Sequence, residues 1–340
     1  MSQTRTDKPI LEVVNLETTF PLKSGLLRRT YAEVQAVSDV SFSVYPGETL
    51  GLVGESGCGK STVARTITGL ERSKRGHVYF DGQDLTQLSY AQMRALRGDI
   101  QLIFQDPYSS LNPRMTVREL VTEPWQIHGG VVQRGRWEAE LTELLEMVGL
   151  NLEHADRYPH QFSGGQRQRI SIARALALRP KLVICDEAVS ALDVSIQAQI
   201  LNLLKDLQEK LGLAYLFISH DLSVVRHVCD RVAVMYLGKI MEIGDRDTIY
   251  ELPTNPYTQA LLSAAPVTKP WLAEGRKEIV LEGDIPSPAN PPSGCRFRTR
   301  CWKAEDVCAR EEPGLVDRGH GHPSACHFAE VDTTVIPQIG

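Results

Sequence analysis

The sequence predicts an α/β fold in which helices cover a largely parallel central sheet. Apolar segments rich in β-branched residues alternate with segments of helical periodicity along most of the chain. The segments 181–187 and 213–221 are apolar without polar alternation, as expected of strands that are buried on both faces. A glycine-rich turn at 54–62 joins a predicted strand to a predicted helix. With 340 residues, the chain can build a large core and more than one domain.

The expected elements follow one another along the chain. β-branched residues predict strands over 10–20 and 37–54, with a tight turn at 46–47. Pro107 ends a short apolar strand because it has no N–H to pair, and Gly212 ends a long helix. The elements are completed by helices over 60–70, 116–148, 164–180 and 195–212, strands over 100–107, 181–187 and 213–221, and hairpins over 76–85 and 231–244.

Composition and charge exclude several classes of protein. The net charge is −5, so nothing in the overall balance favours nucleic acid as a partner. No apolar run reaches the 18 or so residues of a membrane-spanning helix, and residues 1–10 lack the apolar core of a signal peptide. These features indicate a cytosolic protein that reaches a membrane only through a partner.

Residues 54–62, GESGCGKST, fit the pattern of a phosphate-binding loop. Glycines let successive backbone N–H groups converge on phosphate oxygens, and the helix that follows directs its positive end at the same anion. Lys60 is expected to reach the β- and γ-phosphates, and the Ser61 hydroxyl is expected to bind Mg²⁺. Cys58 is expected to have no catalytic role. The predicted nucleotide-binding residues of this loop are Gly54, Ser56, Gly57, Cys58, Gly59, Lys60, Ser61 and Thr62.

An acidic pair ends the predicted strand 181–187. Asp186 would hold Mg²⁺ through water, and Glu187 would polarise the attacking water as a general base. An acidic pair alone is a weak signal. Its combination with the phosphate loop predicts ATP hydrolysis.

The segment FSGGQ at 162–166 forms a second glycine-rich turn before a helix, and so a second candidate anion site. It resembles the LSGGQ signature motif of ABC ATPases. The resemblance implies a RecA-like core with an antiparallel β subdomain and an α-helical subdomain at about 107–165. In that family, the signature of one subunit closes on the nucleotide held by another subunit. The residues that would do so are Ser163, Gly164, Gly165 and Gln166.

Three further positions match functional residues of the family. Gln105 matches the Q-loop residue that senses Mg²⁺ and couples to the membrane partner. Asp193, in SALD, matches the D-loop residue that crosses the dimer interface. His220 matches the switch histidine that contacts the γ-phosphate. We expect Glu187, His220 and Gln105 to be the catalytic residues.

The resemblance leaves the adenine contact open and includes one departure. Phe20 takes the place of the aromatic residue that stacks on adenine, but Tyr31 is a rival because a basic segment intervenes. Ala188 stands where the family usually has proline. It carries no chemistry, so the expectation of hydrolysis holds.

Longer segments resemble the ATPase subunits of dipeptide and oligopeptide importers, and SALDVS looks more like their F-type than their D-type. These segments are FQDPYSSLNPRMTV, DRYPHQFSGGQRQR, NPYTQALLSAAP and PSPANPPSGCRFRTRC. The resemblance implies a peripheral motor subunit at the cytoplasmic face of the inner or plasma membrane, with a D-type ATPase partner and two permease subunits. A solute-binding protein would take part indirectly. The resemblance also implies a cassette over 1–265 and an extension over 266–340.

Two other functions are weighed against an importer motor. A soluble ABC ATPase of DNA repair would carry a long coiled coil between the phosphate loop and the signature, but 63–161 shows no sustained heptad. A translation factor of this class would carry two cassettes, and this chain has one. A scaffold that binds nucleotide without turnover is disfavoured by the presence of both Glu187 and His220.

Four of the seven cysteines lie in the Pro-rich C-terminal extension, at positions 295, 301, 308 and 326. Such a set suits tetrahedral zinc or a [4Fe–4S] cluster. Structural zinc usually shows paired ligands two to four residues apart, which Cys295, Cys301, Cys308 and Cys326 lack. The importer resemblance implies the cluster, and zinc or unliganded thiols stay open as alternatives.

Charged and polar residues surround these cysteines. The expectation for His320, His322 and His327 is a solvated loop with no ligand role. Two readings stay open for three nearby arginines, which either offset the charge of a cluster or belong to a solvated basic loop: Arg296, Arg298 and Arg300.

Overall fold

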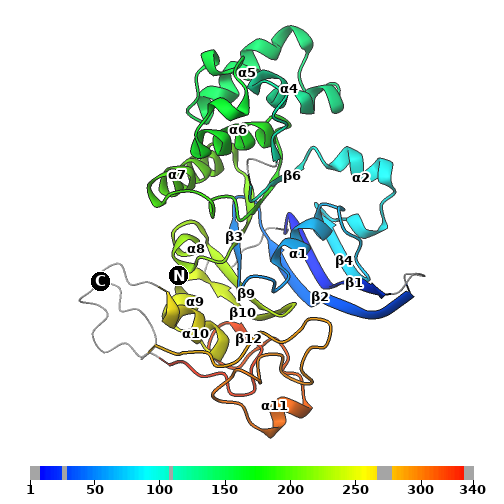
Figure 1. The fold of residues 1–340 in the computed structure, drawn as a ribbon, viewed down its shortest axis with the longest axis vertical. Helices are drawn as coiled ribbons and strands as arrows, with labels where there is room; N and C mark the ends of the chain where they lie inside the picture. The colour runs from blue at the N-terminus through cyan, green and yellow to red at the C-terminus, as the bar shows by residue number, and fades with distance from the viewer. Residues whose placement is uncertain (1–7, 25–28, 107–109, 266–277, 333–340) are drawn as a thin grey trace. The chain divides into compact units, whose positions relative to one another are not determined.

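A computed structural model describes residues 8–24, 29–106, 110–265 and 278–332 of the chain (Figure 1). The chain forms two compact units. The helical unit comprises Met1–Ile10, Val44–Glu48 and Gln87–Ile218, and the phosphate-loop unit comprises Leu11–Ser43, Thr49–Thr86 and Ser219–Gly340. The strand end predicted at Pro107 and the domain boundary predicted after residue 265 fall outside the described residues.

The helical unit contains three parallel strands, β6 (Ile100–Ile103), β7 (Leu182–Asp186) and β8 (Ala214–Ser219). Every residue of β7 and β8 is buried, because helices cover both faces of a parallel sheet. The predicted strands over 181–187 and 213–221 are therefore confirmed.

Helices α4, α5 and α6 of this unit pack together (Figure 1). Thr116 and Glu119 form a capping box at the start of α4. The Trp125 indole donates a 2.7 Å hydrogen bond to the Ala177 carbonyl, which ties α4 to the end of α6. The helices of this unit are α2 (Tyr90–Leu96), α4 (Val117–Ile127), α5 (Trp137–Met147), α6 (Gly164–Leu176) and α7 (Val194–Leu211), with short 3₁₀ turns η2 (Arg134–Arg136), η3 (Leu152–His154) and η4 (Pro159–Gln161).

Of two helix ends predicted from the sequence, one is confirmed and the other lies elsewhere in the structure. Helix α7 ends at Gly212, which has a φ of 67°, as predicted. Helix α6 ends at Leu176, before the expected stop at Pro180. Arg179 lies at a φ of 54°, so the backbone has left the helix before the proline is reached.

The phosphate-loop unit carries an antiparallel sheet with the strand order β2-β1-β4-β5. A hydrogen bond of 3.1 Å between the Thr18 and Thr66 hydroxyls joins this sheet to helix α1. The strands are β1 (Leu11–Ser24), β2 (Arg29–Val44), β4 (Arg75–Phe80) and β5 (Gln83–Asp84), and η1 (Leu85–Gln87) follows.

The same unit contains the strand that leads into the phosphate loop. Strand β3 (Thr49–Val53) is buried and runs parallel to β9 (Arg231–Tyr236), which forms the predicted hairpin with β10 (Lys239–Asp245). The C-terminal extension adds β12 (Pro323–Ser324) to β10 and β11 (Val316–Asp317) to β12. The helices of the phosphate-loop unit are α1 (Lys60–Ile67), α8 (Leu222–Val228), α9 (Arg246–Glu251), α10 (Pro256–Ala264) and α11 (Asp306–Arg310).

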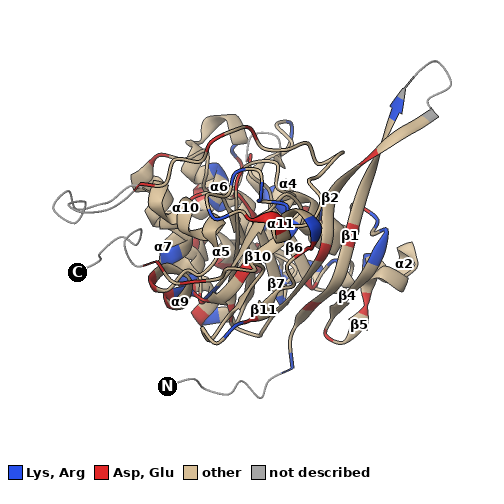
Figure 2. Ribbon diagram, turned by 90° about the horizontal axis from the view of Figure 1, so that it is seen from below, with Lys and Arg blue, Asp and Glu red and all other residues tan. Residues whose placement is uncertain are grey.

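Basic and acidic residues are interspersed along the ribbon (Figure 2). None of the helices in the described parts of the chain combines the length and the apolar character needed to cross a membrane.

Candidate functional site

The glycines of the phosphate loop are required by their surroundings. A Cβ at Gly54 would lie 2.0 Å from the Met235 carbonyl oxygen, and a Cβ at Gly59 would lie 2.1 Å from the Ala36 carbonyl oxygen. Both residues also have φ values in the region that favours glycine, 153° and 110°. The loop therefore lies directly against the backbone of two other segments.

Lys60 begins helix α1 and is 4% exposed. Its Nζ donates to the Gly54 carbonyl at 2.7 Å and to the Glu55 carbonyl at 3.0 Å, so the ammonium lies inside the curve of the loop. No side-chain hydrogen bond caps the start of α1 at Gly59. Burial raises the pKa of Cys58, which fits the expectation of an inert thiol.

The acidic pair ends strand β7 in the helical unit. Asp186 is 7% exposed, and Glu187 follows with a φ of 49°. The Glu187 N–H donates to Ile218, and the Ser190 hydroxyl donates to the Glu187 carbonyl, which holds this unusual backbone. The Gln105 amide donates a 2.8 Å hydrogen bond to Glu187 Oε2. Two of the predicted catalytic residues are thus brought together.

The signature segment begins helix α6. Ser163 is its N-cap, and Ser163 and Gln166 form a reciprocal capping box. A Cβ at Gly165 would lie 2.4 Å from Ile196 Cγ2, so this glycine lets α6 approach α7 closely. At Gly164 a Cβ would lie 3.4 Å from a Leu192 methyl carbon.

The remaining predicted residues lie at element ends or on strands. Asp193 is the exposed N-cap residue of α7, and its side chain makes no cap hydrogen bond. His220 is exposed and directly follows β8. Phe20 is half-buried on β1, whereas Tyr31 is 68% exposed on β2.

The four C-terminal cysteines line one small pocket, together with Phe297 and Phe328. Burial raises the pKa of the Cys295 thiol to about 11 and that of Cys301 to about 12. All four are free thiols. Within the described residues, no group of three or more His, Cys, Asp or Glu side chains is placed to hold a metal ion.

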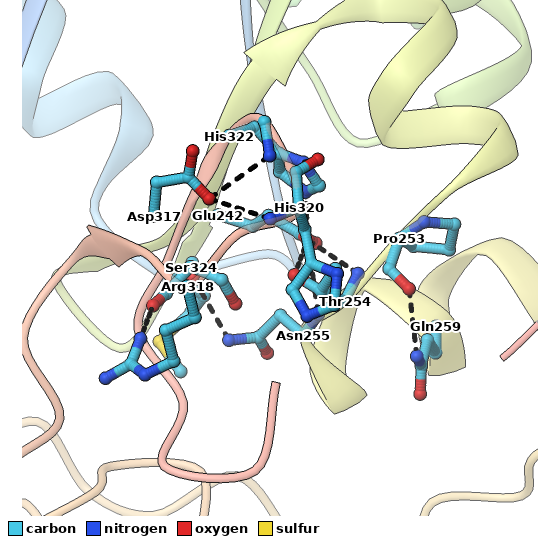
Figure 3. Close-up of polar contacts among 12 residues, drawn as sticks. Glu242, Pro253, Thr254, Asn255, Gln259, Asp317, Arg318, His320, His322 and Ser324 are labelled. Carbon is cyan, nitrogen blue, oxygen red and sulfur yellow. Dashed lines mark hydrogen bonds and ion pairs between the residues drawn. The ribbon is translucent and has the colours of Figure 1, made fainter. Parts of the chain in front are cut away.

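The expectation that His322 is solvated is wrong. His322 is 2% exposed, and its Nε2 lies 2.7 Å from Oε1 of Glu242, a fully buried residue on β10 (Figure 3). The same carboxylate oxygen accepts hydrogen bonds from the Thr254 N–H and hydroxyl and from the Asn255 N–H. The sequence offered one signal for this contact. Glu242 is the one acidic residue in the mostly apolar hairpin 231–244, and a buried charge needs a partner.

The reading of a solvated basic loop is wrong for two arginines. Arg296 is 7% exposed, and the Arg300 side chain is 8% exposed. Arg300 forms an ion pair with Glu55, the second residue of the phosphate loop. Nothing local in the sequence predicts this pair, because its members lie 245 positions apart.

Comparison with known proteins defines the class. Residues 37–190 match the ABC transporter family. The fold is similar to a dimeric post-hydrolysis structure of the ATP-binding cassette MJ0796 bound to ADP and Pi, with a TM-score of 0.62, 30% identity, and coverage of 69% of this chain and 98% of that one. The chain is an ABC-type ATPase.

Residues 241–308 match the oligopeptide/dipeptide transporter C-terminal region. The oligopeptide transport ATP-binding protein AppF of Bacillus subtilis is 54% identical over 94% of this chain and 97% of that protein. OppF of Escherichia coli is 49% identical over 94% of this chain and 96% of that protein. The chain therefore belongs to the oligopeptide and dipeptide group of ABC transporter ATP-binding proteins.

Proposed function

We propose that this chain is the motor subunit that hydrolyses ATP to drive import of peptides, or of a related small solute, through a membrane permease. The observation that carries the proposal is the hydrogen bond between Gln105 and Glu187. It joins the segment that precedes the helical subdomain to the carboxylate assigned to water activation. The solute class comes from the relatives above, which are oligopeptide transport ATP-binding proteins.

Each residue has a proposed role in hydrolysis. Lys60 and the loop N–H groups bind the phosphates, and His220 contacts the γ-phosphate. Glu187 polarises the attacking water. The proposed Mg²⁺ site consists of Ser61, Gln105 and Asp186, and the adenine is proposed to stack on Phe20. The half-burial of Phe20 supports it over the exposed Tyr31, because a stacking residue needs a fixed orientation.

The signature is proposed to act on a second subunit. Ser163 and Gln166 already cap α6, so the N-terminus of this helix presents an ordered turn. This turn, with Gly164 and Gly165, would close on the nucleotide of a D-type partner, and Asp193 would cross the interface. The exposed, uncapped Asp193 side chain supports that role.

The proposed assembly places the chain at the cytoplasmic face of the inner or plasma membrane. Two permease subunits would bind it there, and a solute-binding protein would act with them. The proposed cassette covers 1–265, with a helical subdomain at about 107–165, and the extension covers 266–340. A soluble role in DNA repair or translation is less favoured, since the relatives above are transport ATP-binding proteins.

The four cysteines of the extension are proposed to hold a [4Fe–4S] cluster. The proposal rests on the importer resemblance and on the four thiols that line one pocket. The described side chains contain no group already placed to hold a metal ion, so the thiols would have to close on the cluster as it binds. The cluster would supply a covalent cross-link between separate parts of the extension.

The test is transport by the complete complex in vesicles. The complex with Glu187→Gln should bind its solute and ATP but move no peptide, whereas a matched surface variant, Glu209→Gln, should transport normally. ATP hydrolysis stimulated by DNA or ribosomes, with no response to the permease and its solute, would contradict the proposal and favour the soluble alternative.

A further inference from the structure

Arg300 of the C-terminal extension forms a bidentate ion pair with Glu55 of the phosphate loop. Its Nη1 lies 2.7 Å from Glu55 Oε2, and its Nη2 lies 3.1 Å from Oε1. The Arg300 side chain is 8% exposed and that of Glu55 is 24% exposed. Paired geometry and low exposure distinguish this contact from an ordinary surface ion pair.

Glu55 is held at three different groups. Arg300 binds its carboxylate, the Tyr257 hydroxyl accepts from its N–H at 3.0 Å, and Lys60 Nζ donates to its carbonyl at 3.0 Å. Lys60, which is assigned to the phosphates, therefore binds the backbone of the residue whose side chain is bound by Arg300 of the extension. A shift of Glu55 would be transmitted to Lys60.

The segment that carries Arg300 is itself anchored beside the loop. Phe297 is 1% exposed and packs against the rings of Tyr236 and Tyr257, with centroids 5.3 and 5.2 Å away. Arg296 donates to the Leu237 carbonyl, and the next residue, Gly238, donates its N–H to the Cys58 carbonyl at 2.8 Å. The extension thus supports the loop at Glu55 directly and at Cys58 through the turn of the β9–β10 hairpin.

Charge gives this contact a consequence for ligand binding. A carboxylate in a loop that receives phosphates repels the ligand, and the repulsion is strong where little water screens it. Arg300 neutralises that carboxylate. Without Arg300, Glu55 would keep its negative charge next to the anion site.

We propose that Arg300 is a positioning residue of the phosphate loop, and that nucleotide affinity depends through it on the folded C-terminal extension. The inference rests on the proposed ATP binding. It adds that the extension completes the nucleotide site of its own chain. The extension would then affect ATP binding through the order of the segment 296–300.

The test measures the Kd of the purified full chain for MgATP and MgADP by calorimetry. Arg300→Gln should weaken ATP binding about tenfold, because it leaves Glu55 charged and unpaired. The loss should be larger for ATP than for ADP, since ATP carries more charge. Arg300→Lys should stay within about threefold of the wild type, because it keeps the charge but loses the paired geometry.

The double variant Glu55→Gln/Arg300→Gln should regain most of the affinity, since it removes both charges. A purely structural loss would not be rescued in this way. Arg298→Gln is the matched control: Arg298 lies two positions away, and among the described residues its side chain donates hydrogen bonds only to Ser293, so ATP affinity should not change. A wild type that binds no nucleotide would refute the proposed function itself.

Three results would overturn the inference alone. They are an Arg300→Gln affinity within about twofold of the wild type, a double variant no better than the single one, and an equal loss in Arg298→Gln. If Arg300→Gln does not fold, the double variant and Arg300→Lys decide, since both avoid an unpaired charge. If both variants have the same ratio of ATP affinity to ADP affinity as the wild type, the inference is supported. If the double variant loses affinity for ATP about tenfold and keeps its affinity for ADP, the inference is refuted.

Discussion

Gln105, two positions after the end of strand β6, donates a 2.8 Å hydrogen bond to the side chain of Glu187, the residue that follows strand β7. In the proposed mechanism Glu187 is the general base, and the amide bound to one carboxylate oxygen would leave the other oxygen to accept the proton. The pair would then link proton transfer to the segment that leads toward the helical subdomain.

Glu187→Gln should leave ATP affinity nearly unchanged and lower kcat by at least about a hundredfold. In the proposed mechanism the carboxylate acts on water in the transition state, so its loss should appear in turnover and not in binding. Single-turnover hydrolysis and nucleotide binding measured on the same preparation check this. Turnover at the wild-type rate would show that Glu187 is not the base.

Gln105→Leu should lower kcat by about tenfold while retaining ATP binding, since the Glu187 side chain then loses its orienting donor. Gln105→Glu should be worse, because it places a second negative charge against Glu187. The measurement is the ATPase rate of both variants against pH. A wild-type rate in Gln105→Leu would mean that the amide donor is unimportant.

Lys60→Ala should weaken ATP binding by about ten- to a hundredfold, the value of one or two charge-assisted hydrogen bonds. Ser163→Arg should instead spare binding at the chain's own loop and block ATP-dependent association with a second subunit. Ser163→Ala controls for the lost helix cap, worth about 1 kcal/mol. Equal loss of binding in the lysine and arginine variants would contradict a signature that acts on the partner.

The His322–Glu242 contact should make the docking of the extension pH-dependent. Burial lowers the pKa of His322, but the hydrogen bond to Glu242 and its charge outweigh burial and raise the pKa above its usual value. Because the pKa of His322 is higher in the folded state, protonation of this residue stabilises the fold. The stabilisation is fully present at a pH below the unfolded-state pKa of about 6.5, and it is lost as the pH rises through the folded-state pKa. The Tm advantage of the wild type over His322→Gln should therefore shrink from about pH 6 to 8. A constant difference would contradict the prediction.

Cys301→Ser should remove iron from protein that was prepared without oxygen, because one of four proposed thiolate ligands is lost. Iron and acid-labile sulfide analysis of the wild type should find both in near-equal amounts, with broad visible absorbance. Cys58→Ser, outside the extension, should retain the iron. Stoichiometric zinc without sulfide in the wild type would replace the cluster with a zinc site.

Local patterns in the sequence predicted the elements that are determined locally. Helix 195–212 has an apolar stripe and Gly212 at its end, and the strand 181–187 is an uninterrupted apolar run, so each was placed correctly. Helix α2 was missed, although Ser89 and Gln92 form a capping box that the sequence displays. Its seven residues are too few for a clear periodic signal.

Contacts between distant parts of the chain could not be predicted in the same way. Strand β12 pairs Ser324 with Glu242, and the Arg300 partner lies in the first quarter of the chain. A basic residue near a turn has the same local pattern whether it is solvated or buried against a carboxylate. Only the fold, which brings 296–300 beneath the hairpin turn at Leu237, separates the two cases.

The ion pair of Glu55 with Arg300 also sets an order of events during synthesis of the protein. A ribosome releases the N-terminal segments first, and they begin to fold before the rest of the chain exists. Glu55 emerges long before its partner, so the nascent phosphate loop carries an uncompensated carboxylate until translation has passed residue 300. If the proposed role of Arg300 holds, the nucleotide site matures late in the biogenesis of this chain, and ribosome-bound chains that stop short of the extension should bind ATP poorly.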